Sequence, residues 1–223
     1  MTKPWEQIEL VDYTKKEEIL HTATHAAGLL LSVCIVFFCL VPAVRQNDPL
    51  RILCSVLYLF GTSVMFLTSA LYHGTTEPGR KKLLRLLDHC MIFFAVAGTA
   101  TGCVPPVKEL VGTAPALVLS VCAWFGAVCG LILTLFSFEK TKPLQMALYI
   151  GTAGCCALAG GKTFALLPRG AFLCFLIGSA CLLTGAVLYG IGKRKRYFHA
   201  VFHVFVDIGL TVFFMGIQKY CFS

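Results

Sequence analysis

Seven long apolar stretches, separated by short polar breaks, make up almost the whole chain. Each stretch is close to the roughly twenty residues that an α-helix needs to cross a bilayer. The breaks carry Pro, Gly and charged residues, which end helices or lie at a membrane surface. The pattern therefore predicts seven transmembrane helices, near residues 21–44, 50–73, 86–104, 116–138, 144–161, 171–191 and 198–218.

The composition supports the same class of protein. Of the 223 residues, 57% are hydrophobic and 13% are charged, whereas soluble domains carry roughly a quarter charged residues. The first eighteen residues are polar and of mixed charge, so we expect no cleavable signal peptide, because such a peptide has an apolar core. We expect a polar cytoplasmic segment over 1–18 and one all-α, polytopic domain in the cell membrane over 19–223.

The basic residues are distributed unevenly along the chain. Its 19 Lys and Arg give a net charge of +8, which can indicate a nucleic-acid partner. Here the charges lie in short loops beside apolar stretches, so membrane lipids, and not nucleic acid, are the expected partners. Thirteen of the 19 fall in the N-terminal segment and in the breaks after the second, fourth and sixth stretches. Because Lys and Arg accumulate on the cytoplasmic side, the N-terminus is predicted inside and the C-terminus outside.

Three histidines lie at the predicted cytoplasmic ends of two helices. His199 and His203 are four residues apart and share a helix face, and His73 ends the second apolar stretch. Three histidines and a water form the open site of catalytic zinc, so zinc is the predicted cofactor. Asp88 is the candidate base for that water, and Ser69 can orient a ligand or donate to an oxyanion. The alternative is that these are interfacial side chains wetted by lipid headgroups.

Two further residues are candidates to support the metal ligands by hydrogen bonding. His25 forms a second HxxxH pair with His21, three residues after Glu18, but this pair has no obvious third ligand of its own. Asp207 lies one turn beyond His203 on the same helix face, where it can hold an imidazole in one tautomer. A carboxyl that is hydrogen-bonded elsewhere within the bundle is the alternative for Asp207.

Five stretches spread over nearly the whole chain resemble the hemolysin III group, the bacterial branch of the progestin and adipoQ receptor (PAQR) family. They are EEILHTATHAAGLLLS (17–32), SALYH (69–73), LRLLDHCMIFFAVAGTAT (84–101), KPLQMALYIG (142–151) and YFHAVFHVFVDIG (197–209). The resemblance implies seven helices with the N-terminus inside. It also implies a zinc ion at the cytoplasmic side, held by three histidines.

The family motifs correspond to single positions of this chain. The SxxxH motif gives Ser69 and His73, the aspartate of the DH pair gives Asp88, and the final HxxxH gives His199 and His203. The wider superfamily includes alkaline ceramidases, which implies metal-dependent hydrolysis of lipid amides. The family name comes from a reported pore-forming, haemolytic activity.

The chain departs from the family pattern at three positions outside these motifs. Members usually carry Asn where His21 stands, and many have an apolar residue at Asp207 and a further His where Phe213 stands. None of the three is a ligand in the family motifs, so the zinc assignment is unaffected. The shape of the pocket and the identity of the substrate do not transfer from the family.

Three hypotheses for function follow from the residues and the resemblance. The leading one is a zinc-dependent lipid hydrolase, an amidase that acts from the inner leaflet. The second is a receptor-like sensor of membrane homeostasis, in which the zinc only pins helices together. The third, a pore-former, is disfavoured because the positions in the middle of the stretches are apolar, whereas a channel needs polar residues along its pore. The sequence identifies neither a soluble protein partner nor an oligomeric state.

Overall fold

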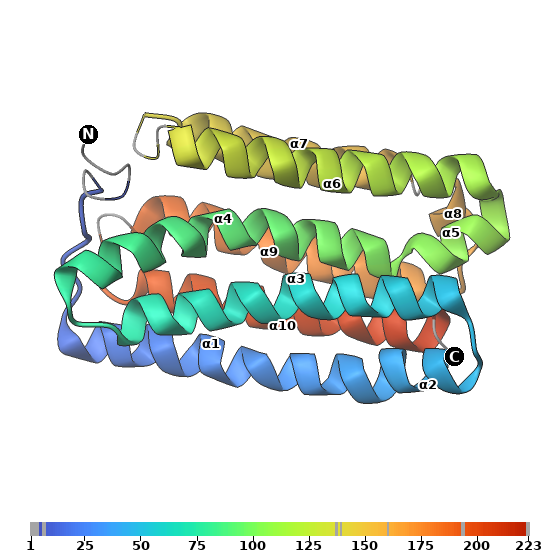
Figure 1. Cartoon of the computed structure of the whole chain (residues 1–223), viewed down its shortest axis with the longest axis horizontal. Helices are drawn as coiled ribbons and strands as arrows, with labels where there is room; N and C mark the ends of the chain where they lie inside the picture. Colours follow the sequence, from blue (N-terminus) through green and yellow to red (C-terminus); the bar gives the residue numbers. More distant parts are fainter. Residues whose placement is uncertain are drawn as a thin grey trace.

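The computed structural model describes residues 5, 8–136, 138, 140–159, 161–192 and 195–221, and over these residues it contains helices and no strands. The long helices lie side by side along one axis, as Figure 1 shows. Six of them are long and apolar enough to cross a membrane. The predicted class, an all-α, multi-pass membrane protein, is thereby confirmed.

The first long rod runs through a π-helical turn without a break. Helix α1 (Lys15–Ile35) continues through η2 (Val36–Leu40) into α2 (Val41–Arg45). The helices that follow are α3 (Pro49–Gly74), α4 (Pro78–Gly102), α5 (Val104–Val111), α6 (Thr113–Phe136), α7 (Lys142–Ala159), α8 (Gly161–Leu166), α9 (Arg169–Gly192) and α10 (Phe198–Cys221). Helix α1 begins and α10 ends at opposite ends of the bundle (Figure 1).

The predicted seventh crossing corresponds to α7. This helix has 18 residues and is not among the six candidate spans, because its first turns carry Lys, Pro and Gln within a short apolar segment. It packs along α6, which is a candidate span. Seven crossings, with the N-terminus inside, therefore remain a prediction.

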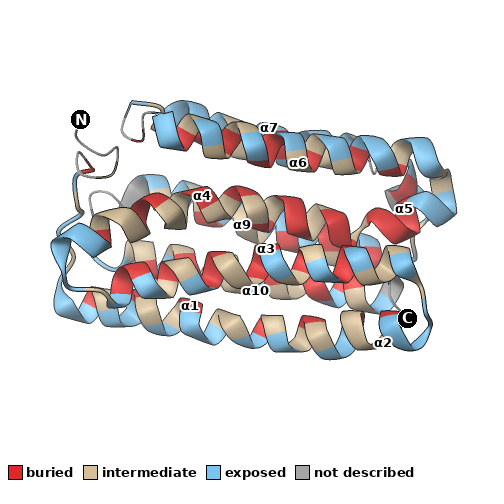
Figure 2. Cartoon of the chain, in the orientation of Figure 1, coloured by how far each residue is buried: buried red, intermediate tan, exposed pale blue. Residues whose placement is uncertain are grey.

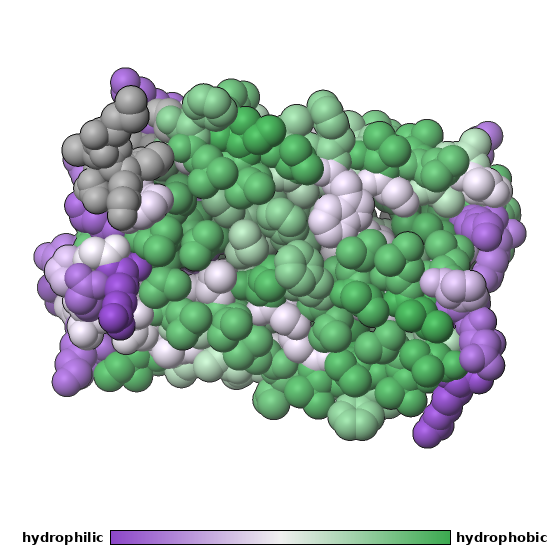
Figure 3. Space-filling view, viewed as in Figure 1, coloured by the Kyte–Doolittle hydropathy of each residue, from purple (hydrophilic) through white to green (hydrophobic). Residues whose placement is uncertain are grey.

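The order of packing brings the two ends of the chain together. Helix α3 packs between α1 and α4, α4 packs against α6, and α10 packs against both α9 and α1. Buried residues face the interior of the bundle (Figure 2). On the face seen in Figure 3, apolar residues form a broad band and hydrophilic residues gather at the two ends. This distribution matches a bilayer-embedded band between two aqueous faces.

Helices α3 and α4 approach each other very closely at two glycines. A Cβ on Gly61 would clash with the carbonyl oxygen of Phe94, and a Cβ on Gly98 would lie 2.9 Å from the carbonyl oxygen of Leu57. Small residues allow such backbone contact between membrane helices. The contact fixes the axial position of α3 relative to α4, and thus of the polar residues near their ends.

Several predicted breaks are in fact helical. Helix α4 begins at Pro78, eight residues before the predicted start, so the basic residues at 80–85 lie on its first turns. The Glu77 carboxylate accepts hydrogen bonds from the backbone N–H groups of Gly79 and Arg80, which satisfies donors that have no partner within the helix. The same bonds, chiefly that from Arg80, lower the pKa of Glu77. Proline in the first turn fits a helix start because it needs no acceptor there.

Three other differences have the same cause. The polar residues 105–109, between the third and fourth predicted helices, lie in α5, whose first turn carries the two prolines. Residues 161 and 162, at the end of the fifth predicted helix, begin α8. Helix α1 starts at Lys15 and not near residue 21, because Thr14 and Glu17 form a capping box. Pro and charged residues were read as breaks, although at a first turn they begin helices.

Candidate metal centre

Five histidines from three helices pack together at the end of the bundle where α1 and α10 begin and α3 ends. The ring centroid of His73 lies 5.3 Å from that of His199 and 5.2 Å from that of His203. His21 lies 4.5 Å from His73 and 4.7 Å from His199. His25 stacks on His203 with centroids 3.7 Å apart. Helices α1, α3 and α10 therefore bring five imidazoles to one place.

The distances between ring nitrogens define a possible metal site. One nitrogen each of His21, His73 and His199 lie within 4.8 Å of one another. The Nε2 atoms of His199 and His203 are 3.1 Å apart. The sequence had placed His73, His199 and His203 at one metal and had left His21 open. The structure places all four rings around the same point.

Many of these nitrogens are buried and have no hydrogen-bond partner. Both ring nitrogens of His21, both of His25 and Nε2 of His73 are in this state. A buried polar atom without a partner destabilises a fold, and imidazole nitrogens suit zinc and other transition metals. A metal ion among these rings would satisfy several of the nitrogens at once. The residues present therefore fit the cofactor that the sequence predicts.

Two of the rings have one nitrogen oriented by a neighbouring acceptor. His203 Nδ1 lies 3.3 Å from the carbonyl oxygen of His21 and 3.3 Å from Thr24 Oγ1. A carbonyl oxygen only accepts, so Nδ1 donates to it and Nε2 is left with a lone pair. His73 Nδ1 lies 2.6 Å from Glu18 Oε2, which has the same effect. Such hydrogen bonds from the other ring nitrogen accompany almost all metal-binding histidines.

Tyr13 covers the cluster from the polar end. Its ring lies 4.7 Å from that of His21, stacks on His199 at 5.3 Å and is tilted against His73 at 5.8 Å. Burial raises the pKa of the Tyr13 hydroxyl above its ordinary range, and the nearby Tyr72 raises it further. The hydroxyl therefore stays protonated at any physiological pH and forms a neutral roof over the rings.

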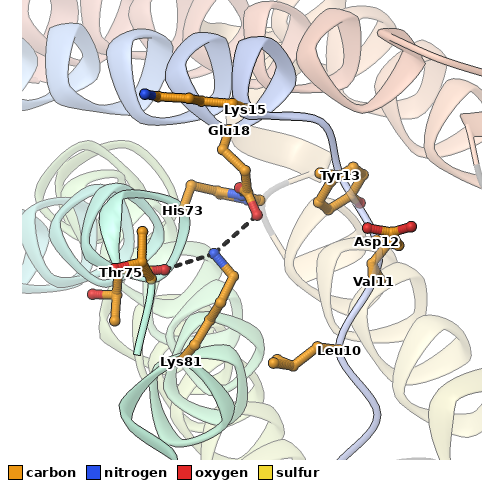
Figure 4. A pocket seen from close by; sticks show the side chains of 10 residues that line it. Leu10, Val11, Asp12, Tyr13, Lys15, Glu18, His73, Thr75 and Lys81 are labelled. Atoms are coloured by element: carbon orange, nitrogen blue, oxygen red, sulfur yellow. Dashed lines mark hydrogen bonds and ion pairs between the residues drawn. The ribbon is translucent and has the colours of Figure 1, made fainter. Parts of the chain in front are cut away.

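An open pocket of about 640 Å³ leads to the cluster beside this roof. One wall is the segment 10–13, and the other wall includes Thr75 and Lys81, as Figure 4 shows. His73 lines the pocket together with Glu18. Water and small polar molecules thus have a route to the edge of the histidine cluster.

The candidate catalytic residues lie on α3 and α4. Ser69 is buried one turn before His73, and Asp88 is half-buried on α4. Ser69 and Arg85 are neighbours of the Asp88 carboxyl, but the Ser69 hydroxyl has no hydrogen-bond partner. Serine and aspartate therefore lie near each other on α3 and α4 without a hydrogen bond between them.

The two supporting candidates occupy different surroundings. His25 is buried between the His203 ring, on which it stacks, and the edge of Phe66. Asp207 Oδ1 is buried without a hydrogen-bond partner, while His203 Nδ1 faces the carbonyl oxygen of His21. The acceptor beside His203 is therefore a backbone carbonyl of α1.

Sequence reasoning did not assign Glu18, Lys81 or Tyr13 to the site. In the sequence, Glu18 is distinguished only by its position three residues before His21, and Lys81 is one of several basic residues after the second apolar stretch. The available signal was a carboxylate one turn before a histidine at the start of an apolar stretch, since a charge there needs a partner. Nothing in the sequence pattern distinguishes Tyr13.

Comparison with known proteins adds relatives of similar length. A family model described as "Haemolysin-III related" matches residues 13–214, a range that includes all five clustered histidines. A "Hemolysin-3 homolog" of Bacillus subtilis (strain 168) is 27% identical over 210 residues, which cover 94% of this chain and 96% of that protein. A "Hemolysin-3" of Bacillus cereus is 25% identical over 206 residues, which cover 92% of each protein.

Proposed function

Because the chain belongs to the haemolysin-III-related family, we propose that it is a zinc-dependent membrane hydrolase of lipid amides. The observation that carries the proposal is the packing of buried imidazoles with unpaired nitrogens at one end of the bundle. Metal-dependent hydrolysis requires such a ligand set, and a lipid substrate would reach it directly from the surrounding bilayer.

We assign the ligand positions to His73, His199 and His203. His73 and His203 each have Nδ1 facing an acceptor, which leaves Nε2 to bind the metal. His21 also has a nitrogen within 4.8 Å of nitrogens of His73 and His199, but neither of its nitrogens has a hydrogen-bond partner that fixes a tautomer. We prefer His203 to His21 because a ring whose Nδ1 donates to a fixed acceptor presents its Nε2 lone pair without reorganisation. His199 is included because its Nε2 lies 3.1 Å from that of His203.

The protein groups around this ligand set have distinct roles. When bound, a zinc ion supplies a Lewis acid and makes water acidic enough to ionise near neutral pH. Asp88 accepts the proton of the attacking water, and the Ser69 hydroxyl donates to the carbonyl oxygen as that oxygen gains charge. Tyr13 limits the access of bulk water. Water adds to the amide carbon, the C–N bond breaks, and Asp88 passes the proton it accepted to the leaving nitrogen, so the products are a fatty acid and an amine.

The proposal is tested with purified protein in nanodiscs. Elemental analysis should find about one zinc per chain, and a fluorescent ceramide in the same discs should be cleaved. Asp88→Asn should keep the metal and lose turnover by on the order of a hundredfold, because general base catalysis contributes roughly 10²–10⁴-fold. A wild-type protein without stoichiometric metal, or with metal and no turnover of any lipid amide, contradicts the proposal.

A structural metal is the second candidate, and His21 is the observation that favours it. Four imidazoles around one ion form a closed site, whereas catalysis needs an open position. In that case the metal would pin α1, α3 and α10 together in a sensor or receptor-like protein. Asp88→Asn would then change neither metal content nor any turnover, and removal of the metal would lower only thermal stability.

A pore has less support from the interior of the bundle. Among the described residues, the buried charged side chains are Glu17, Lys81 and Arg85, and all three belong to the end that carries the histidines. The buried polar residues farther along the bundle, such as Ser55, Thr62 and Thr101, carry neutral hydroxyls, so the charged rings of a selective pore are not found among the described buried residues. Reproducible single-channel currents in a planar bilayer would reverse this ranking.

A further inference from the structure

The carboxylate of Glu18 joins three helices at the edge of the histidine cluster. On α1, its Oε2 lies 2.6 Å from Nδ1 of His73, which belongs to the last turn of α3. Its Oε1 lies 2.9 Å from Nζ of Lys81 on the first turn of α4. Figure 4 shows Glu18 between these two side chains. Each oxygen of the carboxylate thus has a different partner from a different helix.

We propose that Glu18 is a positioning residue of the metal centre and that Lys81 holds Glu18 in place. This inference rests on the metal-binding role proposed for His73. Glu18 keeps the proton of His73 on Nδ1, so that Nε2 presents its lone pair to the metal. Glu18 acts on the proposed ligand atom, Nε2, only through its hydrogen bond with Nδ1 of the same ring.

The direction of the hydrogen bond follows from the chemistry of the two groups. A carboxylate oxygen only accepts, so the nitrogen that faces it at 2.6 Å carries the hydrogen. The ring is thereby fixed in the tautomer with a bare Nε2. That Nε2 is buried and has no hydrogen-bond partner, while the side chain of His73 is fully buried. The Nε2 lone pair of His73 is therefore free to coordinate a metal ion.

Lys81 explains why the carboxylate stays in place. Its ammonium group has three N–H donors. They reach Glu18 Oε1 at 2.9 Å, the carbonyl oxygen of Tyr72 at 3.1 Å and that of Thr75 at 2.9 Å. The two carbonyls lie at the C-terminal end of α3, where no helical N–H satisfies them. Lys81 therefore ties the end of the helix that carries His73 to the residue that orients it.

The same oxygen is also the nearest carboxylate atom to a second histidine. Glu18 Oε2 lies 3.8 Å from His21 Nδ1, which is too long for a hydrogen bond. Glu18 Oε2 therefore accepts a hydrogen bond from His73 and not from His21. The tautomer of His21 is not fixed by Glu18. This difference separates the two rings, although both are buried in the same cluster.

The decisive variant is Glu18→Gln, which keeps the size of the side chain but replaces one oxygen with an NH₂ group. Lys81 donates a charge-assisted hydrogen bond, the stronger kind, so it takes the amide oxygen. The NH₂ group then faces His73 Nδ1, which must accept, and the proton moves to Nε2. We expect the affinity for Co²⁺ to fall by about 10–100-fold, the usual effect of losing such a partner.

A second variant should reverse this loss. In Glu18→Gln with Lys81→Met, no ammonium competes for the amide oxygen, so the amide can turn and accept from His73 Nδ1. Water from the open pocket can satisfy the two freed carbonyls of α3. The affinity for Co²⁺ should return to within about threefold of wild type. A purely structural role of the ion pair gives no such recovery, because two losses of stability do not cancel.

The controls change the same residue types at the same end of the bundle. Glu77→Gln removes a carboxylate that caps α4 and contacts no histidine. Arg80→Met removes a cation next to Lys81 whose partner is Glu77, at 4.0 Å. Both should bind Co²⁺ as wild type does, since neither side chain touches the Glu18 carboxylate.

Three measurements on the full chain in nanodiscs decide the question. They are chelator competition for the Co²⁺ affinity, the visible spectrum of bound Co²⁺, and ¹⁵N NMR of histidine-labelled, metal-free protein, with the His73 signals assigned by loss in His73→Gln. The NMR spectrum should show hydrogen on Nδ1 of His73 in wild type and on Nε2 in Glu18→Gln. Circular dichroism confirms that each variant is folded.

The outcomes separate this inference from the proposed function. A folded Glu18→Gln protein with wild-type affinity and spectrum overturns the positioning role alone. Loss in Glu18→Gln without recovery in the double variant also overturns it, because the pair is then structural. A wild-type protein that takes up no Co²⁺ removes the metal centre, and both proposals fall. Loss followed by recovery supports the positioning role.

Discussion

Replacing His21 by Asn separates the two possible ligand sets of the metal centre. The sequence places His73, His199 and His203 on the metal, whereas the structure also brings one nitrogen each of His21, His73 and His199 within 4.8 Å of one another. Asn is close in size to the imidazole but is a poor zinc ligand. The carbonyl oxygen of His21 accepts from His203 Nδ1, and a side-chain substitution leaves that bond intact.

The expected magnitude follows from the number of ligands lost. Zinc binding to a four-ligand structural site is worth about 10–16 kcal/mol, or about 3 kcal/mol per ligand. At about 1.4 kcal/mol per factor of ten, the loss of one imidazole weakens binding by about a hundredfold or more. We therefore expect this loss for His203→Ala. For His21→Asn we expect a change of less than about threefold, because the three bound nitrogens remain.

The measurement is chelator competition for Zn²⁺ with each variant in nanodiscs, and thermal unfolding gives a second readout. Bound metal stabilises the folded chain by about 2.7 kcal/mol at a free concentration one hundred times Kd. His21→Asn should keep this stabilisation and His203→Ala should lose it. A hundredfold loss in His21→Asn with none in His203→Ala refutes the argument from tautomers. Loss in both variants indicates four ligands and a closed, structural site.

Three further predictions concern the frame around the centre. Tyr13→Ala should make zinc release to a chelator faster, because it removes the ring that covers the cluster. Tyr13→Phe keeps that ring and should release zinc as wild type does. Equal release rates for the two variants contradict a covering role of Tyr13. Gly61→Val should destabilise the protein by about 1–3 kcal/mol, seen as a lower thermal midpoint, because its side chain meets the Phe94 carbonyl. Glu17→Ala should cost about 2 kcal/mol and lower the same midpoint, because the Glu17 carboxylate caps α1 and accepts from the Tyr197 N–H at 2.9 Å.

The sequence predicted the elements far better than their ends. Apolar length alone located the long helices, because a bilayer imposes one minimum length on every crossing. The start of α4 was placed at residue 86 and not at Pro78, because basic residues suit both a loop and the first turns of a helix. Where a polar segment borders a membrane, hydropathy does not separate these two cases, and the capping carboxylate of Glu77 decides between them.

The site was predictable only where its residues share a helix or lie at the same depth in the predicted membrane. His199 and His203 follow from a spacing of four, and His73 follows from its position at a helix end. The meeting of His21 with these rings depends on the packing of α1 against α10, which no local pattern encodes. The bond between Glu18 and His73 likewise joins residues 55 positions apart, so a carboxylate near a surface gave no sign of its partner.

The contact between α1 and α10 also has a consequence for biosynthesis. The cluster takes histidines from α1 and from α10, so two of its five imidazoles are synthesised only after all the helices that precede α10. A nascent chain that stalls before residue 199 already holds Glu18, Lys81 and His73, yet it lacks the donors that close the ligand set. With the ligand set proposed above, metal uptake requires synthesis through α10, and products that terminate before residue 199 should reach quality control without metal.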